Sequence, residues 1–280
     1  MKISLILGTY GRYSELERFL ESLKAQQYKN FELILCDQNP EGFLKDLIKK
    51  YSPFFEIKHL ITERGLSRAR NAGIKVAEGD IFAFPDDDCV YPGDLLIKVK
   101  KIFEKQVEID GIAGRPVSID GGRMDQKFLK ERARVTKNNV FFTVVSYTLF
   151  LRRSLIESVG YFDEKLGVGS GTMFGSGEEV DFILRALEKN FKILYFPEIM
   201  VGHPSKDPAL TGFTKEELKR AKSYNAGFAY ILKKYDYSLS FKIKALIRPI
   251  LGAIYWGLKG DFKRVVYQYY KFLGRIQGWF

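Results

Sequence analysis

Short apolar runs alternate with amphipathic segments over the first 110 residues of this 280-residue chain. Runs rich in β-branched and aromatic residues predict buried strands, whereas apolar residues spaced three and four apart predict helices. Strands that alternate with helices in this way are typical of a Rossmann-like, mostly parallel sheet with flanking helices, an α/β fold. The predicted strands are residues 2–7, 31–36, 55–61 and 80–84, and the predicted helices are residues 13–26, 44–51 and 67–77.

The pattern changes after Gly111, where apolar and polar residues mix with Gly and Arg. Three β-like runs there indicate a smaller, mixed-sheet region: residues 140–151, 192–196 and 199–201. Helical spacing then covers residues 215–234 and 241–258 and a last helix from Asp261. We therefore predict one domain over residues 1–212, made of the halves 1–110 and 111–212, followed by a helical region over residues 213–280.

Most of the positive charge lies in the last quarter of the chain. The net charge is +11, and residues 213–280 alone carry +10 together with sixteen of the 41 aromatic residues. The longest charge-free run within residues 241–258, 249–258, has ten residues, whereas a membrane-spanning helix has about 20. Basic, aromatic and amphipathic helices of this kind lie on anionic membranes. Packing of these helices against the rest of the protein is the second interpretation, and nucleic-acid binding is ranked last and not expected.

Two further features bear on location. The N-terminal apolar run, Ile3–Leu7, is too short for the core of a signal peptide and is predicted to be a strand. The two cysteines, Cys36 and Cys89, cannot form a disulfide framework and are typical of a reducing cytosol.

The loops that follow successive predicted strands carry different kinds of ligand. In open α/β sheets, ligands gather beyond the carboxyl ends of the strands. Arg side chains suit phosphate and a lone carboxylate suits a ribose hydroxyl or a base N–H. In chain order these loops offer Thr9, Tyr10 and Arg12, then Asp37, then Arg70, and then Asp86, Asp87 and Asp88.

The three consecutive aspartates repel one another, so a positive partner is expected near them. Mg²⁺ is typically held by one or two carboxylates, with substrate phosphates completing its coordination. A solvated acidic turn is the alternative. The position of the aspartates at a predicted strand end favours a metal site.

Five motifs in this order resemble the family 2 glycosyltransferases, which have the GT-A fold. They are GTYGR, LSRARNAG, FPDDDCVYP, FLRRSLIESVGYFDEKLG and GSGEEVDFILRALEKNF, and the resemblance covers about residues 1–205. It implies that Asp86 and Asp88 hold Mn²⁺ or Mg²⁺ on a nucleoside-diphosphate sugar. It also implies that Thr9 and Asp37 contact the nucleoside, and that Arg70 lies near the diphosphate or positions the aspartate loop. Tyr10, Arg12 and Asp87 belong to the same loops and are expected to contribute to donor binding.

The acidic residues Glu178, Glu179 and Asp181 begin a predicted helix. Ser176 and Glu179 fit a capping box, and acidic residues in a first turn stabilise the helix dipole. The family resemblance implies more for Glu179, because the second carboxylate of the family's Glu-Asp pair is the general base. Here that residue is Glu, and a carboxylate can accept the proton of an attacking hydroxyl. Glu178 and Asp181 are the alternatives for this role.

A histidine completes the set of candidate site residues. His203 follows a β-like run, and the resemblance implies that it joins the metal ligands or contacts the diphosphate. A structural role is the alternative for a lone histidine. His59 lies inside a predicted strand and is not assigned to the site.

Together, these features predict an inverting, metal-dependent glycosyltransferase. Residues 1–110 are expected to form its nucleotide-sugar-binding half and residues 111–212 its acceptor-binding half. By the resemblance, the donor is a UDP-sugar and the acceptor is a glycan or a polyprenyl-diphosphate-linked glycan of surface polysaccharide synthesis. The enzyme is expected in the cytoplasm, peripheral on the inner face of the cell membrane. One alternative is a non-catalytic membrane adaptor that only binds nucleotide sugars. The other is a nucleotidyltransferase, for which GTYGR is a poor phosphate loop.

Overall fold

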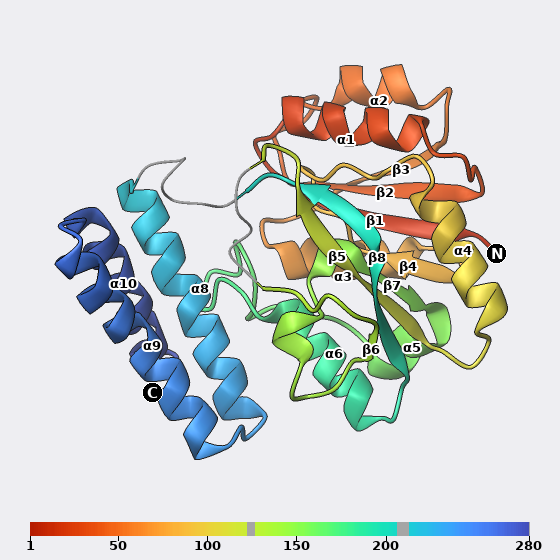
Figure 1. Ribbon diagram of the computed structural model, residues 1–280. Coiled ribbons are helices and arrows are strands. Elements are labelled where there is room, and N and C mark those ends of the chain that lie inside the picture. Colours follow the sequence, from red (N-terminus) through yellow and green to blue (C-terminus); the bar gives the residue numbers. More distant parts are fainter. Residues whose placement is uncertain (122–126, 206–212, 280) are drawn as a thin grey trace. The chain divides into compact units, whose positions relative to one another are not determined.

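The computed structural model describes residues 1–121, 127–205 and 213–279 (Figure 1). The described residues form two compact units. The sheet unit comprises residues 1–64, 68–162 and 182–205, and the helical unit comprises residues 65–67, 163–181 and 213–279. The helical unit is thus assembled from three separate stretches of the chain.

The sheet unit is built on a mixed, mostly parallel sheet of eight strands in the order β3-β2-β1-β4-β7-β5-β8-β6. Strands β1 to β4 are parallel, β7 is antiparallel to both of its neighbours, and β6 is antiparallel to β8. The strands are β1 (Ile3–Thr9), β2 (Phe31–Asp37), β3 (Glu56–Ile61), β4 (Ile81–Ala83), β5 (Gly111–Ser118), β6 (Ala133–Arg134), β7 (Leu149–Arg152) and β8 (Ile193–His203).

Helices flank this sheet (Figure 1). Buried residues of α1, α2 and α4 share one apolar cluster with alternate residues of β1 and β2. On the other face, Gly73 of α3 lies directly against Ile6 and Cys36, where a Cβ atom would come within 2.4 Å of the Ile6 side chain. The helices are α1 (Ser14–Lys24), α2 (Lys45–Tyr51), α3 (Leu66–Val76), α4 (Leu95–Lys105), α5 (Arg153–Val159) and α6 (Glu178–Glu188).

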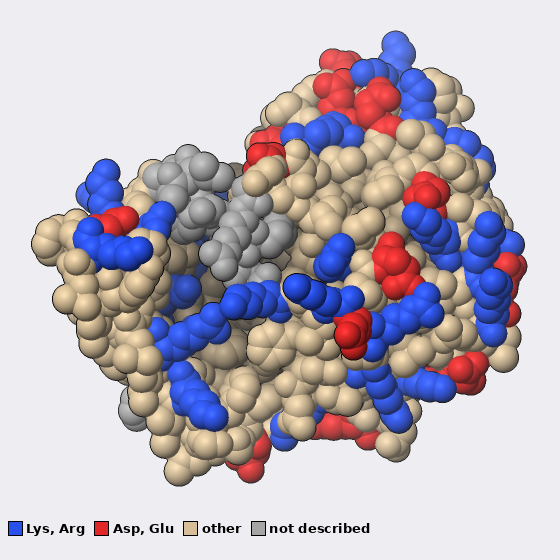
Figure 2. Space-filling model, in the orientation of Figure 1, with Lys and Arg blue, Asp and Glu red and all other residues tan. Residues whose placement is uncertain are grey.

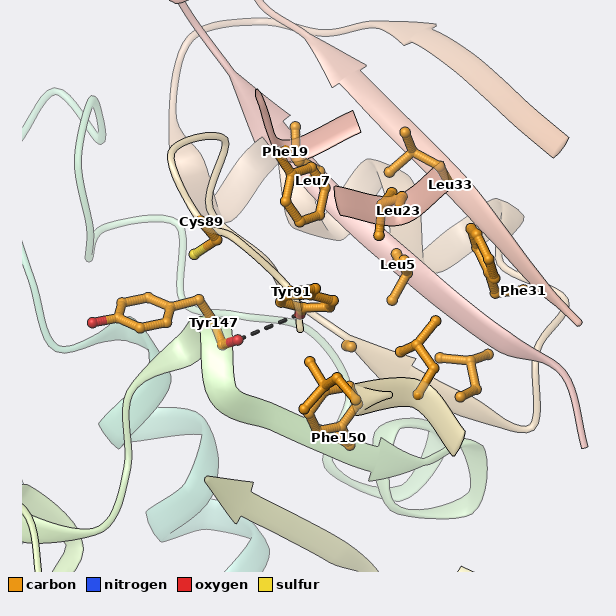
Figure 3. Close-up of a cluster of buried hydrophobic side chains, with 14 of the residues drawn as sticks. Leu5, Leu7, Phe19, Leu23, Phe31, Leu33, Cys89, Tyr91, Tyr147 and Phe150 are labelled. Carbon is orange, nitrogen blue, oxygen red and sulfur yellow. Dashed lines mark hydrogen bonds between the residues drawn. The ribbon is translucent and has the colours of Figure 1, made fainter. Parts of the chain in front are cut away.

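The apolar core explains why these segments adopt their predicted structures. β1 and β2 are buried along their length, as expected for strands covered on both faces. Figure 3 shows Leu5, Leu7 and Phe19 in this core. In the same core, Tyr91 packs edge-on against Phe19, and its hydroxyl donates to the carbonyl oxygen of Tyr147 at 3.4 Å. This packing fixes the segment that immediately follows the three aspartates.

A buried carboxylate lies at the amino-terminal edge of the same strands. The side chain of Glu32 is fully buried and accepts hydrogen bonds from the Ser4 hydroxyl at 2.6 Å and the Glu78 amide at 2.7 Å. Lys2 and Lys58 approach it to 3.0 and 2.8 Å. These contacts lower the pKa of Glu32 to about 2 although burial opposes its charge. Because the two lysines neutralise it, this cluster is a structural ion network.

The helical unit contains three long helices, α8 (Lys215–Lys234), α9 (Leu239–Leu258) and α10 (Phe262–Gln277). Each begins where a side chain accepts a hydrogen bond from a first-turn amide, namely Thr214, Ser238 and Asp261. α10 packs closely on α8, since Gly274 and Gly278 lie against α8 backbone carbonyls. None of the described helices is long and apolar enough to cross a membrane.

α9 presents an exposed apolar face. Leu251, Ile254 and Leu258 are 60%, 56% and 86% exposed, and α9 contains no Asp or Glu. We call this face the α9 stripe: Leu239, Ile243, Ile247, Ile250, Leu251, Ile254 and Leu258. Figure 2 shows Lys and Arg side chains both over the C-terminal helices and over the sheet unit on the face in view.

The element predictions for residues 1–84 are confirmed to within about two residues at each boundary, and α8, α9 and α10 lie where the helical spacing places them. The predicted β run over residues 140–151 is wrong for its first nine residues, which form two short 3₁₀ turns before β7. The hydroxyls of Thr143 and Thr148 donate to backbone carbonyls three or four residues earlier. Such local bonds compete with strand pairing.

Candidate functional site

The candidate site lies at the carboxyl edge of the parallel strands. β1 and β2 run in register so that Thr9 pairs with Asp37 at their last positions. β4 pairs with β1 in parallel, and the aspartates follow it after two residues. Loops after three neighbouring strands therefore meet at one edge of the sheet, as the sequence predicts.

The three aspartates differ in their partners. Asp86 is 23% exposed and accepts a hydrogen bond from Arg70 Nη2 at 3.1 Å. Asp87 is buried and receives the Thr9 hydroxyl at 2.8 Å and Arg12 Nη1 at 2.8 Å, and Arg12 also contacts Asp88 at 2.5 Å. Burial raises the pKa of Asp87 to about 6, although Arg12 and Thr9 act in the opposite direction. Arg12 and Arg70 thus supply part of the positive charge that the three aspartates require.

Asp86, Asp88 and His203 form a group suited to a metal ion, with their ligand atoms all within 4.8 Å of one another. His203, at the end of β8, is 1% exposed and stacks on Tyr147 with ring centroids 4.6 Å apart. Its Nδ1 lies 2.7 Å from the carbonyl oxygen of Pro204, and its Nε2 lies 3.0 Å from Asp88 Oδ1. If Nδ1 carries the proton and donates it to that carbonyl, the lone pair of Nε2 points at a carboxylate oxygen. Two acceptors in contact fit a bound cation.

A second carboxylate lies at the end of β2. Asp37 is 1% exposed, and its Oδ1 accepts hydrogen bonds from the backbone and side-chain nitrogens of Asn39 at 2.9 and 2.8 Å. Its Oδ2 lies 3.0 Å from His59 Nε2. Asn39 Oδ1 in turn accepts from the Gly11 amide at 2.6 Å. This network ties the loops after β1 and β2 together and presents polar groups suited to a base or ribose.

Two residues of the first loop take different positions. Tyr10 is 48% exposed and stacks under the Arg64 guanidinium, 3.9 Å from the ring centroid. Arg12 contacts the aspartates as described above.

Arg70, in α3, is fully buried and hydrogen-bonded to Asp86, a geometry that favours positioning of the aspartate loop over direct contact with a diphosphate.

The candidate base residues belong to the helical unit. Glu178 and Asp181 are 6% and 0% exposed, whereas Glu179 is only half-buried. The Asp181 carboxylate accepts hydrogen bonds from Lys234 Nζ at 2.6 Å and the Tyr235 hydroxyl at 2.8 Å. Asp181 is therefore committed to structure, and Glu179 is the most accessible of the three.

Thr9, Arg12, Asp37, Arg70, Asp86, Asp87, Asp88 and His203 all lie in the sheet unit around this edge, and their catalytic and binding roles stay predictions. The sequence interpretation missed Asn39 and His59. His59 lies two residues before Ile61, which pairs with Asp37, so both side chains face the same side of the sheet. Strand register combined with alternation could have found it.

The sheet unit, with its mostly parallel sheet and flanking helices, has the GT-A fold. The profile described as glycosyl transferase family 2 matches residues 4–159, so the chain belongs to that family. It resembles the mannosyltransferase PcManGT from Pyrobaculum calidifontis, solved with GDP-Man and Mn²⁺, with a TM-score of 0.65 at 14% identity, over 99% of this chain and 86% of that chain. That likeness shows the fold.

Curated relatives are also glycosyltransferases. Glycosyltransferase AglE of Haloferax volcanii is 24% identical over 215 residues, which cover 73% of this chain and 67% of AglE. The Escherichia coli enzyme WfaP, named as a UDP-Glc:alpha-D-GlcNAc-diphosphoundecaprenol beta-1,3-glucosyltransferase, is 29% identical over 138 residues, 44% of this chain and 55% of WfaP. The matches thus span about half to two thirds of these relatives.

Proposed function

We propose that the protein transfers a sugar from a UDP-sugar to a hydroxyl of a lipid-linked glycan, with inversion at the anomeric carbon, in surface polysaccharide synthesis. The observation that carries this proposal is the convergence of Asp86, Asp88 and His203 at the strand edge that also holds Asp37. WfaP, which is named for a UDP-sugar donor and a diphosphoundecaprenol acceptor, supports the choice of substrates.

Mn²⁺ or Mg²⁺ is the metal we propose for this cluster. Asp86, Asp88 and His203 would hold it, and the Mn²⁺ in PcManGT supports the proposal. A bound divalent ion supplies Lewis-acid stabilisation of the charge that develops on the departing nucleoside diphosphate. Arg70 and Arg12 orient the aspartates for this ligand set through the contacts described above.

The nucleoside is proposed to bind at the ends of β1 and β2. Asp37 accepts a hydrogen bond from the base or ribose, while Asn39 and His59 hold its carboxylate in place. Thr9 secures Asp87, and the exposed Tyr10 ring offers a surface for stacking. Each of these side chains is proposed either to bind the nucleoside or to orient a side chain of the site.

Glu179 is the proposed general base. It accepts the proton of the acceptor hydroxyl as the oxygen attacks the anomeric carbon on the face opposite the leaving diphosphate. The displacement is direct, and no covalent glycosyl-enzyme forms. Glu178 is the alternative base.

The helical unit is proposed to bind the cytoplasmic, anionic face of the membrane. The α9 stripe supplies the apolar contact, and the basic residues on α9 and α10 supply attraction to acidic lipid headgroups. A peripheral enzyme placed in this way meets a polyprenyl-diphosphate-linked acceptor at the membrane surface.

The test combines nucleotide binding with transfer. A ligand that binds only the folded state raises the melting temperature, so we expect UDP with Mn²⁺ to stabilise the protein. Chelation by EDTA and the substitution Asp88→Asn should each remove this shift and lower transfer from a UDP-sugar at least 100-fold. Asp94→Asn, a partly exposed carboxylate paired with Lys98, is the matched control and should leave both unchanged. Full turnover by Asp88→Asn would refute the metal assignment.

A further inference from the structure

The segment that carries the candidate base is part of the helical unit. Residues 163–181 form one compact body with the C-terminal helices rather than with the sheet that precedes them in sequence. This segment ends in the first turn of α6, which contains Glu178 and Glu179. Its position is therefore tied to α8.

One face of α8 lies along residues 174–181. The Gly175 amide donates to the Ser223 carbonyl at 3.1 Å, and the Ser176 hydroxyl donates to the Tyr224 carbonyl at 2.8 Å. The rings of Phe174 and Tyr230 lie 4.6 Å apart. The α8 residues that contact the segment occupy one side of the helix, in two rows whose members are three or four positions apart: Ser223, Tyr224, Gly227, Tyr230, Ile231 and Lys234. This spacing is that of a single helical stripe.

The stripe ends in a charged cluster at Asp181. The Asp181 carboxylate is fully buried and contacts Lys234 Nζ at 2.6 Å, while the Tyr235 hydroxyl reaches both its Oδ1 and its carbonyl oxygen, at 2.8 and 3.1 Å. Lys234 also lies 3.7 Å from Asp163, at the other end of the segment. Burial opposes the charge of Lys234, but the hydrogen bond and charge of Asp181 raise its pKa.

This cluster restricts the turn that holds the base. Asp181 follows Glu179 by two residues within the same helical turn, so a bond that fixes Asp181 also fixes the backbone at Glu179. The Asp181 side chain is fully buried whereas Lys234 is 32% exposed, so removal of Lys234 leaves a buried carboxylate without its cation, which is costly. Lys234 and Tyr235, far along the sequence, therefore influence the position of the candidate base.

We propose that Lys234 and Tyr235 are positioning residues that act through Asp181 to set the base-bearing turn for catalysis. The inference rests on the proposed function, because it assumes that Glu179 or Glu178 accepts a proton. It assigns to α8 a role in the transfer step, separate from membrane binding. Donor binding, which lies in the sheet unit, should not depend on it.

The substitutions Lys234→Ala and Tyr235→Phe test this proposal, the second being the milder change. Misplacement of a reacting group by about 1 Å can cost about 100-fold in rate, so we expect kcat to fall about 10- to 100-fold in Lys234→Ala and less in Tyr235→Phe. The KM for the donor and the UDP affinity should stay within about twofold. Lys234→Arg should restore most of kcat, and Lys219→Ala, an exposed lysine of the same helix, should behave as wild type.

Amide hydrogen exchange gives a readout that is independent of the reaction. Exchange in residues 174–181 should rise at least tenfold in Lys234→Ala, with little change in β1 and β2. Unchanged kcat and unchanged exchange in both variants would overturn the inference. A parallel loss of kcat and UDP affinity would also overturn it, since it would indicate general loss of structure.

Failure of the proposed function is distinguishable from failure of this inference. If the wild-type chain transfers no sugar while Lys234→Ala still raises amide exchange in residues 174–181, the proposed function is wrong. If the wild type is active and Lys234→Ala has the same kcat, the positioning role of Lys234 is wrong.

Discussion

Substitution of one glycine should separate α8 from the base-bearing segment. Gly227 lies against Ser176, and a Cβ atom at this position would come within 2.2 Å of the Ser176 carbonyl oxygen. It would also lie 2.9 Å from the Ser176 carbonyl carbon. Because both contacts are to backbone atoms, a rotamer change cannot relieve them. Gly227→Ala must move α8 and the segment apart.

The size of the shift follows from these distances. Ordinary Cβ contacts begin at about 3.4 Å, so the two elements must separate by about 1 Å. Overpacking of this kind costs about 1–3 kcal/mol, and replacement of Gly by Ala inside a helix returns about 1 kcal/mol. The net loss of folding stability is then about 0–2 kcal/mol. A displacement of about 1 Å at the base can lower the rate about 100-fold, equivalent to about 2.7 kcal/mol.

The assay is product formation at saturating UDP-sugar with a lipid-linked acceptor in detergent, together with urea unfolding and UDP affinity. We expect Gly227→Ala to lower kcat by about 10- to 100-fold while UDP affinity and the folded state persist. Gly257→Ala is the matched control, since its Cβ atom would meet nothing closer than 3.8 Å. The control should be slightly more stable and fully active.

A stable Gly227→Ala protein with kcat within twofold of wild type would refute the reasoning. It would mean that the base-bearing turn holds its position without α8, or that the residues of that turn take no part in the reaction. The Lys234 variants would then distinguish these two cases.

Two further predictions concern stability and membrane binding. Because the pKa of Glu32 is lowered in the folded state, the stabilisation from its ionised carboxylate is complete above about pH 4.5 and disappears as the pH falls toward about 2. Since Lys2 and Lys58 are partly exposed, we expect this stabilisation to be about 2 kcal/mol. In urea unfolding, the stability difference between wild type and Glu32→Gln should shrink between pH 6 and pH 3, and a constant difference would contradict this. Replacement of Leu251 in the α9 stripe by Glu should weaken binding to anionic vesicles at least tenfold without changing UDP affinity. The control is Val107→Glu, at an exposed site in the sheet unit, which should not change vesicle binding. Equal effects of the two substitutions would argue against membrane binding by the α9 stripe.

The strands and helices of the first half could be predicted from the sequence because their apolar patterns are long and regular. Residues 140–148 could not, since Thr143 and Thr148 use local hydrogen bonds that a pattern of apolar residues does not reveal. The aspartate loop and Asp37 were placed correctly at one sheet edge because parallel strands bring their carboxyl ends together.

Partners within the site were harder to foresee. The pairing of Arg12 with Asp87 and Asp88 depends on loop geometry, and the contact between Asp37 and His59 depends on strand register. The link between Asp181 and Lys234 joins residues 53 positions apart through packing alone. No local sequence motif predicts such a contact.

The three-part origin of the helical unit limits how this enzyme can be recombined. A chimera that exchanges only the C-terminal helices with those of a relative would join an α8 from one parent to the 174–181 segment of the other. Gly227 would then face a segment from the other parent, and the charge at position 234 would have no assured partner at position 181. An exchange that preserves turnover should therefore transfer residues 163–181 and 213–279 from the same parent, leaving residues 68–162 in place.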